Sequence, residues 1–406
     1  VEMLTALNFL LLISCVASQN AVQQVGVAEL KCVQQVCEML HFKTETEVAY
    51  FELELQQQLG SNLTELKLRN SELSRLPLNV FQTLPQLQSF DAYGCGVQHV
   101  AAQCFEGAAQ LLSLQLGGNA IAQLEDHNFA LATQLQQLLL ADNQLQQLPA
   151  AAFAGLTQLQ VLQLQGNRLK RLPSQIFAPL VELQFINLDF NRLRKLPPNL
   201  CSQQRKLIEF SARNNRLQHV ASNAFNKLQR LILNNNDQLQ SLVINATLLQ
   251  LQADNCQLVD LHLQQPQLLQ QLLLSHSRLR SLQFLQNATA LLDLDLSGLQ
   301  QLPEMPQPWP AKQLERLSID ANNFTDWPTK LLLELPKLQV LEVWQQGERQ
   351  VYVRDLNNHQ AYADNNNWLC AQLELLLSGE LLPQDLTIFN DAAASSGFNS
   401  DNCPHV

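Results

Sequence analysis

The sequence predicts an α/β fold, a right-handed solenoid with the form of a horseshoe, short parallel concave strands and mostly irregular convex segments. Three observations predict it. One leucine pattern returns every 24 residues, a phenylalanine returns at the same spacing, and glutamine fills many positions between the leucines. Seven consecutive units keep one register, which excludes chance. Their first residues are Leu63, Leu87, Leu111, Leu135, Leu159, Leu183 and Leu207.

The unit over residues 159–180, LQVLQLQGNRLKRLPSQIFAPL, shows why these positions are fixed. In a strand, side chains alternate between two faces, so Leu162 and Leu164 are buried while Gln163 is exposed. A turn must follow the strand. The amide of Asn167 has donors and acceptors for backbone groups that a turn inside the core would otherwise leave unpaired. One unit alone buries too little apolar surface, so stacking is obligatory.

Later units change their length. They begin at Leu228, Leu248, Leu269, Leu291, Leu314 and Leu338, and the shortest have no room for the phenylalanine segment. We therefore divide the chain into a signal peptide (1–18), an N-terminal cap (19–62), about thirteen repeats (63–362) and a C-terminal cap (363–406). Regular units occupy 63–226, shorter units 227–302 and longer units 303–362.

The repeat motif resembles that of secreted, extracellular-type leucine-rich repeat proteins over about residues 29–403. Residues 366–370, NNWLC, resemble the start of their C-terminal cap. The glutamine-rich turns and reduced caps are similar to the insect leucine-rich immune proteins and to Toll-like receptor ectodomains. The motif is specific for fold and unspecific for function, because sites are grafted onto folds.

An apolar run over residues 3–18 ends in the small residues Ala17 and Ser18, which is typical of a secretory signal peptide. A buried strand or helix is the alternative. No later run reaches the ~20 apolar residues that cross a bilayer. We therefore expect a secreted, extracellular protein without a transmembrane segment.

Nine cysteines are present, and eight remain after a signal peptide leaves with Cys15. Four flank the repeats, where a solenoid end needs a lid and secretion permits disulfides, so we expect two capping bridges. These are Cys32, Cys37, Cys370 and Cys403. A zinc site of Cys32, Cys37 and His41 lacks a convincing fourth ligand, so we expect no metal and no cofactor.

The other cysteines lie inside the repeats. Cys95 and Cys256 occupy the asparagine position, and Cys201 replaces the phenylalanine, which predicts three small buried thiols. A bridge between Cys95 and Cys104 stays open, because its formation depends on distance.

Four asparagines begin the N-x-[ST] motif of N-glycosylation, and all lie away from the concave strands. They are Asn62, Asn245, Asn287 and Asn323.

Composition narrows the class of function. A net charge of −11 argues against nucleic acid, which requires a basic patch. The sequence has no phosphate loop, nucleophile elbow or metal motif, so we predict that the protein is not an enzyme.

Binding is the better class. Exposed aromatic and charged residues on the concave strands are the usual composition of an interface. Surface aromatics that are scattered without a binding role explain the same residues equally well. The candidates are Asp91, Tyr93, Phe185, Asn187, Asp189, Phe190, Glu209, Arg213 and Trp344. We expect a recognition protein for a protein or glycan ligand, in innate immunity or cell-surface signalling. The alternatives are a matrix or adhesion scaffold that acts as a homodimer, and a receptor ectodomain without its membrane segment.

Overall fold

The computed structural model describes residues 21–25, 28–33, 35–40, 62–299, 308–319, 335, 337, 338, 340–343, 351–354, 360–362 and 387–388. The chain separates into two compact units, which are considered one at a time. The N-terminal unit comprises Val1–Leu169 and Ile176–Ile186, and the C-terminal unit comprises Lys170–Gln175 and Asn187–Val406. The expected signal peptide, Cys370, Cys403, Asn323 and Trp344 lie outside the described residues.

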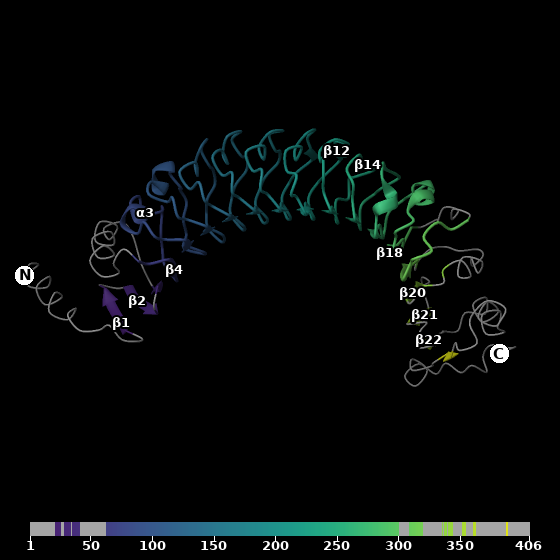
Figure 1. Ribbon diagram of the computed structural model, residues 1–406, viewed down its shortest axis with the longest axis horizontal. Coiled ribbons are helices and arrows are strands. Elements are labelled where there is room, and N and C mark those ends of the chain that lie inside the picture. The colour runs from purple at the N-terminus through teal and green to yellow at the C-terminus, as the bar shows by residue number, and fades with distance from the viewer. Residues whose placement is uncertain are drawn as a thin grey trace, which may run out of the picture. The chain divides into compact units, whose positions relative to one another are not determined.

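The N-terminal unit is a stack of short parallel strands that begins with two antiparallel pairings (Figure 1). Its elements are β1 (Ala21–Val25), β2 (Ala28–Val33), β3 (Val36–Leu40), β4 (Glu65–Arg69), α3 (Val80–Thr83), β5 (Ser89–Asp91), η1 (Ala102–Phe105), β6 (Ser113–Gln115), β7 (Gln137–Leu139) and β8 (Val161–Gln163). β9 (Phe185–Asn187) follows β8. Its first two residues belong to the N-terminal unit, and Asn187 belongs to the C-terminal unit. From β3 to β8 each strand pairs in parallel with the next, and Leu138 is the register partner of Leu162.

The C-terminal unit repeats this arrangement with more strands. Its elements are β10 (Lys195–Leu196), β11 (Glu209–Ser211), β12 (His219–Val220), β13 (Arg230–Ile232), β14 (Ser241–Ile244), β15 (Gln250–Gln252), β16 (Asp260–Leu263), η2 (Pro266–Leu268), β17 (Gln271–Leu273), η3 (Gln283–Asn287), β18 (Asp293–Asp295), β19 (Arg316–Ser318), β20 (Val340–Val343), β21 (Val351–Arg354), β22 (Gln360–Tyr362) and β23 (Thr387–Ile388). Strands β11, β13, β15, β17, β18, β19 and β20 pair in parallel in that order.

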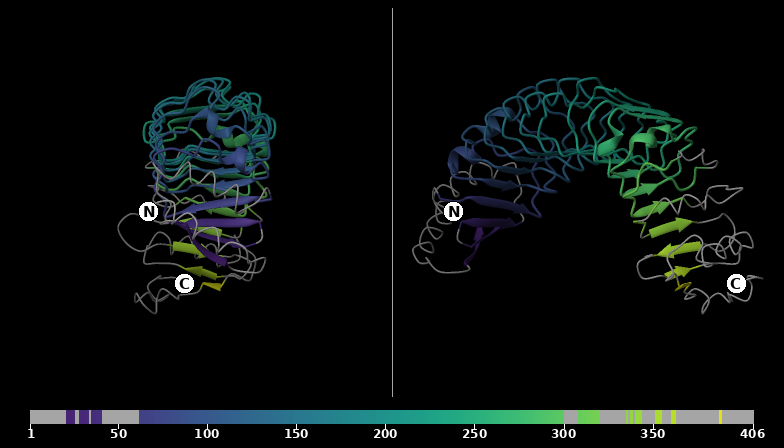
Figure 2. Two further views of the ribbon diagram at one scale, coloured as in Figure 1. Left: turned by 90° about the vertical axis from the view of Figure 1, so that its left-hand side faces the viewer. Right: turned by 45° about the vertical axis from the view of Figure 1, so that its right-hand side comes forward.

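From β5 to β9, each repeat strand buries its central side chain between half-buried or exposed flanks, as the leucine pattern predicts. In β8 the side chain of Leu162 is fully buried between half-buried Val161 and Gln163. In each unit the strands lie along one side of the stack and the return segments along the other (Figure 2). We call the exposed positions on and just after the repeat strands the strand face.

A row of phenylalanine rings fills the space under the return segments of the N-terminal unit. All five rings are buried, and the centroids of contacting neighbours are 5.2 to 6.4 Å apart. They are Phe81, Phe105, Phe129, Phe153 and Phe177. Burying each ring contributes about 1.5–3 kcal/mol, and only the neighbouring turn completes that burial.

The asparagine position acts as the sequence predicts. The Asn167 amide nitrogen donates to the carbonyl oxygens of Leu140 and Leu164 at 2.9 and 3.0 Å, and its oxygen accepts from the Leu145 N–H at 3.0 Å. The amide therefore joins two turns through buried backbone groups.

The thiols within the repeats are buried and form no disulfide, as predicted for Cys95, Cys201 and Cys256. Cys104 forms no disulfide either, so the bridge between Cys95 and Cys104 that the sequence left open does not form. Burial raises the pKa of the Cys256 thiol to about 12 and also raises the pKa of Cys201.

In the N-terminal cap, Cys32 and Cys37 are register partners across β2 and β3. Such a register brings the two residues directly opposite each other in an antiparallel pair. Among the described cysteines, Cys37 is not one of the free thiols.

The return segments contain more regular structure than the sequence predicts. In the C-terminal unit β10 pairs in parallel with β12, and β14 with β16, so two small sheets form on the side away from the repeat strands. In the second of these pairs Leu242 and Leu261 are register partners, and both are buried. The return segments that contain these four strands therefore have an extended backbone.

Candidate functional site

In eleven of the described turns, the residue that follows the repeat strand adopts a left-handed backbone conformation. With the first leucine as position one, this is position eight, and its φ angles lie between 50° and 69°. The residues are Asn70, Gly94, Gly118, Asp142, Gly166, Phe190, Asn214, Asn235, Asn255, His276 and Gly298. Glycine, asparagine and aspartate tolerate this conformation, whereas a bulky side chain in it is strained.

His276 is polar and also enriched in this conformation, so Phe190 is the one apolar side chain among these eleven residues. Its φ is 54°, and the residue is 62% exposed, the largest value among the exposed large apolar residues of the described chain. The Phe190 N–H donates to the carbonyl oxygen of Arg213 at 2.9 Å, which fixes the backbone in the left-handed turn. An aromatic ring is thus held in solvent at a position where it costs stability.

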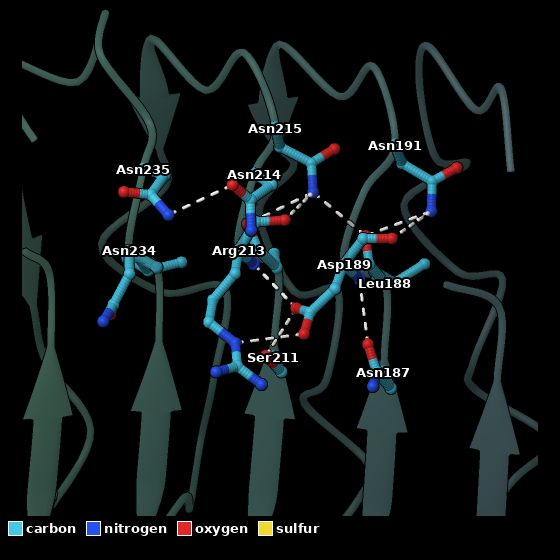
Figure 3. A network of polar contacts seen from close by, with 12 residues as sticks. Asn187, Leu188, Asp189, Asn191, Ser211, Arg213, Asn214, Asn215, Asn234 and Asn235 are labelled. Atoms are coloured by element: carbon cyan, nitrogen blue, oxygen red, sulfur yellow. Dashed lines mark hydrogen bonds and ion pairs between the residues drawn. The ribbon is translucent and has the colours of Figure 1, made fainter. Parts of the chain in front are cut away.

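Asp189 directly precedes Phe190 in the chain. The prediction that the Asp189 side chain is exposed on the concave strands is wrong. Asp189 is only 3% exposed. Its Oδ1 accepts from Ser211 Oγ at 2.5 Å and from the Arg213 N–H at 2.7 Å, and its Oδ2 accepts from Arg213 Nε at 3.1 Å (Figure 3). A buried carboxylate persists only with such donors, so Asp189 is a structural residue that positions Arg213.

The other candidates of the C-terminal unit surround this pair. Asn187 is half-buried, and its Oδ1 accepts from the Asp189 N–H at 2.9 Å (Figure 3). Glu209 is half-buried and forms a 2.8 Å ion pair with Arg230. The Arg213 side chain stays 45% exposed. Arg213 and Phe190 are therefore the predicted residues with the most surface available here.

The remaining candidates belong to the N-terminal unit. Phe185 and Asp91 are half-buried. Tyr93 is 49% exposed, and the Asp91 Oδ1 accepts from its N–H at 2.9 Å. The Tyr93 ring lies over the next turn, because a Cβ at Gly118 would approach its Cζ to 3.0 Å. The described structure thus places the candidates in both units.

A second carboxylate held between turns was not among the candidates. Asp254 Oδ1 accepts from the N–H and Oγ of Ser275 at 3.0 and 2.8 Å, and its Oδ2 accepts from Asn234 Nδ2 at 2.8 Å. Burial raises the pKa of Asp254. Asp189 and Asp254 both occupy position seven, and both accept from a serine of the following turn, a signal that the sequence does contain.

The described residues contain no group of three or more His, Cys, Asp or Glu side chains that could hold a metal ion. They also contain no helix with the length and apolar character to cross a membrane.

Comparison with known proteins agrees with this geometry. The sequence profile of the family described as Leucine rich repeat matches residues 133–193. The fold is a leucine-rich repeat solenoid. No curated protein sequence matches the chain.

Solved structures support the same solenoid. A Toll–Spätzle complex from Drosophila gives a TM-score of 0.62 at 17% identity, over 92% of this chain and 59% of that one. The LRIM1/APL1C complex gives 0.54 at 22% identity, over 77% and 55%. An internalin from Listeria monocytogenes gives 0.53 at 17% identity, over 78% and 87%. The chain therefore spans less than two thirds of the first two of these relatives.

Proposed function

We propose that this protein is a secreted leucine-rich repeat recognition protein that binds a protein partner through its strand face, with Phe190 as the anchor. The observation that carries the proposal is the strained, exposed ring at position eight. Strain of ~1–3 kcal/mol at a single residue persists only where the surrounding structure enforces it, and it concentrates at functional sites. A solvated asparagine there would be more stable and would offer no anchor.

The surroundings of Phe190 favour a protein ligand. Interface hot spots combine an aromatic or arginine anchor with a rigid, well-packed base. Arg213 supplies the second group, because Asp189 fixes its Nε while 45% of the side chain stays exposed. The half-buried ion pair between Glu209 and Arg230 would form part of the polar rim.

The structural neighbours include proteins in complexes, which supports this class. They include the LRIM1/APL1C complex, the Toll–Spätzle complex and an octameric complex that contains the leucine-rich repeat domain of FLRT2. Each binds or assembles with another protein, and we extend only that general role to this chain. Innate immunity and cell-surface signalling are the settings that we propose.

Secretion rests on the segment before the repeats and on the surface sequons. Residues 1–18 resemble a signal peptide. Asn62, Asn245 and Asn287 are exposed, as an oligosaccharide would require. We include in the proposal a bridge between the register partners Cys32 and Cys37, which an oxidising compartment permits.

Affinity capture tests the proposed function. The wild-type protein, a Phe190→Asp variant and a Leu268→Asp variant are each immobilised and exposed to extracellular fluid from the tissue that makes the protein. Leu268 is the matched control, because it is 45% exposed but lies in η2, on a return segment. We expect a discrete partner to be retained by the wild type and by Leu268→Asp, and lost from Phe190→Asp.

The alternative assignments give different results. A partner retained equally by all three baits would place the binding site away from Phe190. Light scattering that shows a wild-type dimer, and a monomer for Phe190→Asp, would favour the homodimeric scaffold over a recognition protein.

A further inference from the structure

A cluster of cations lies on the flank of the C-terminal unit, outside the strand face. Within this unit, six lysines and arginines occupy positions ten, twelve or thirteen of three consecutive turns, and all six are exposed; Arg168, at position ten of the first of these turns, belongs to the N-terminal unit. We call them the basic patch. They are Lys170, Arg171, Arg192, Arg194, Lys195 and Arg216. The whole chain has 25 lysines and arginines and a net charge of −11, so this concentration is local.

The solenoid stacks these positions on one another. Lys195 in β10 is the register partner of His219 in β12, and the Gln218 N–H donates to the Arg194 carbonyl oxygen at 2.8 Å. The Arg216 N–H donates to the Leu193 carbonyl oxygen at 2.9 Å. Equivalent residues of neighbouring turns are therefore about 4.8 Å apart along the stack, as paired strands are.

These cations are unneutralised. Among the described residues, none of the six is in an ion pair. Nearby carboxylates have other partners, because Asp189 binds Arg213 and Glu209 binds Arg230. Asp237 is exposed in the next turn, where it lines the same shallow hollow as Arg216, and it marks the end of the basic patch.

We propose that the basic patch binds a linear sulfated polysaccharide. Arginine presents a planar fork of donors that matches the oxygens of a tetrahedral or planar anion, and four of the six cations are arginines. A regular row of such groups fits a chain that carries anions at repeated intervals. Because the rest of the protein is acidic, only a short stretch of a polyanion can be engaged favourably.

The same charges could attract nucleic acid, and the surroundings disfavour it. Binding to single strands uses aromatic side chains on which bases stack, and none of the six is aromatic. Reading a duplex requires a helix or ribbon that enters a groove, whereas the patch lies on short turns and on the two-residue strand β10. A sulfated chain requires only accessible cations.

Heparin is the probe for this proposal, and its binding is measured over a series of salt concentrations with the full chain. The test variant is Arg192→Gln with Arg194→Gln. The control is Arg278→Gln with Arg280→Gln, which removes the same charge from exposed residues at positions ten and twelve of a distant turn. We expect the test variant to lose affinity by about tenfold or more, and the control to stay within about twofold of the wild type.

Two further measurements sharpen the result. The variant Arg192→Lys with Arg194→Lys keeps the charge but loses the planar forks, so we expect its affinity to lie between those of the wild type and the glutamine variant, and the salt dependence of the glutamine variant should be shallower by ~2 released ions. Neutral dextran should not compete. Wild-type protein that does not bind heparin, equal losses in test and control variants, or tighter binding to a short DNA duplex than to heparin would each overturn the proposal.

Discussion

At the scale of single residues, a buried carboxylate at the end of a strand requires donors, and Asp189 obtains its side-chain donors from the following turn. Ser211 is itself buried, and Arg213 contributes both its N–H and its Nε. Removing the carboxylate would leave a buried hydroxyl and a backbone N–H without their acceptor. The cost of an unsatisfied buried group exceeds the gain from an exposed ion pair.

Replacement of Asp189 tests this difference. We expect Asp189→Ala to lower the free energy of unfolding by about 1–3 kcal/mol. The matched control Glu209→Ala removes a carboxylate from a half-exposed ion pair and should cost only about 0–1 kcal/mol. Urea denaturation of both variants measures the difference. Equal losses would show that the Asp189 network contributes no more than a surface pair.

Asp254 gives a prediction of pH dependence. Because burial raises its pKa in the folded state, the folded protein binds more protons than the unfolded chain just above the ordinary pKa of an aspartate. Stability therefore falls as pH rises through this window. Asp254→Asn removes this loss of stability, because an asparagine side chain does not ionise. The Asn234 amide can rotate so that its oxygen accepts from the new side chain.

We expect the stability of Asp254→Asn relative to the wild type to be greater at pH 7 than at pH 3.5, because the wild-type carboxyl takes up a proton as the pH falls and the cost of its buried charge is relieved. Thermal unfolding at the two values measures it. A difference that does not change with pH would contradict the raised pKa.

At the scale of one turn, the asparagine amide supports the strand-to-turn junction. Asn119 and Asn143 make the same contacts as Asn167, each across the interface with a neighbouring turn. At Cys95 the thiol donates to the carbonyl oxygens of Leu68 and Tyr93 at 3.6 and 3.5 Å, but it does not replace the amide oxygen as acceptor, and the Leu73 N–H instead donates to the Cys95 carbonyl oxygen at 2.6 Å. The turn can thus be closed by a different acceptor, although a thiol is a weaker donor.

Asn167→Leu should therefore destabilise the N-terminal unit by about 1–3 kcal/mol, because it leaves buried N–H and C=O groups unpaired. Arg168→Ala, at the adjacent exposed residue, should be neutral within about 0.5 kcal/mol. Differential scanning calorimetry compares the two. A melting temperature of Asn167→Leu equal to that of Arg168→Ala would remove the asparagine position from the account of the fold.

Much of each turn can be predicted from the sequence, because leucine, asparagine and phenylalanine fix one register at each repeat. Leu162, Asn167 and Phe177 are all buried as the pattern requires. The burial of Asp189 could not be derived from that alternation, since it depends on donors 22 and 24 residues away. The leucine pattern also does not predict the left-handed backbone of Phe190, which becomes evident only when position eight is compared across the turns.

At the scale of the whole molecule, average composition conceals local surface chemistry. The net charge of −11 argues against polyanion ligands, yet the basic patch concentrates cations on three turns. Patterning at one repeat position, rather than total charge, decides which ligand a repeat protein can approach. The same distinction applies to the strand face, where position eight carries one large apolar side chain, Phe190, among glycines and polar residues.

Glycosylation is a further property of the whole molecule. Asn62, Asn245 and Asn287 are exposed and carry the sequon, so we expect all three to be modified when the protein passes through the secretory pathway. Asn323 carries the same motif and lies outside the described residues. Mass spectrometry before and after N-glycosidase treatment measures occupancy at each site. An unchanged mass would contradict both the glycans and the secretory route.

The central claim is that Phe190 reduces the stability of the fold and supports recognition. The most direct test measures the melting temperature and the partner dissociation constant for Phe190→Asn, which introduces the residue found at position eight in Asn214 and Asn235. We expect the melting temperature to rise, by an amount corresponding to about 1 kcal/mol or more, and the affinity to fall by about tenfold or more. A variant that gains stability and keeps full affinity, or one that loses both, would contradict the account.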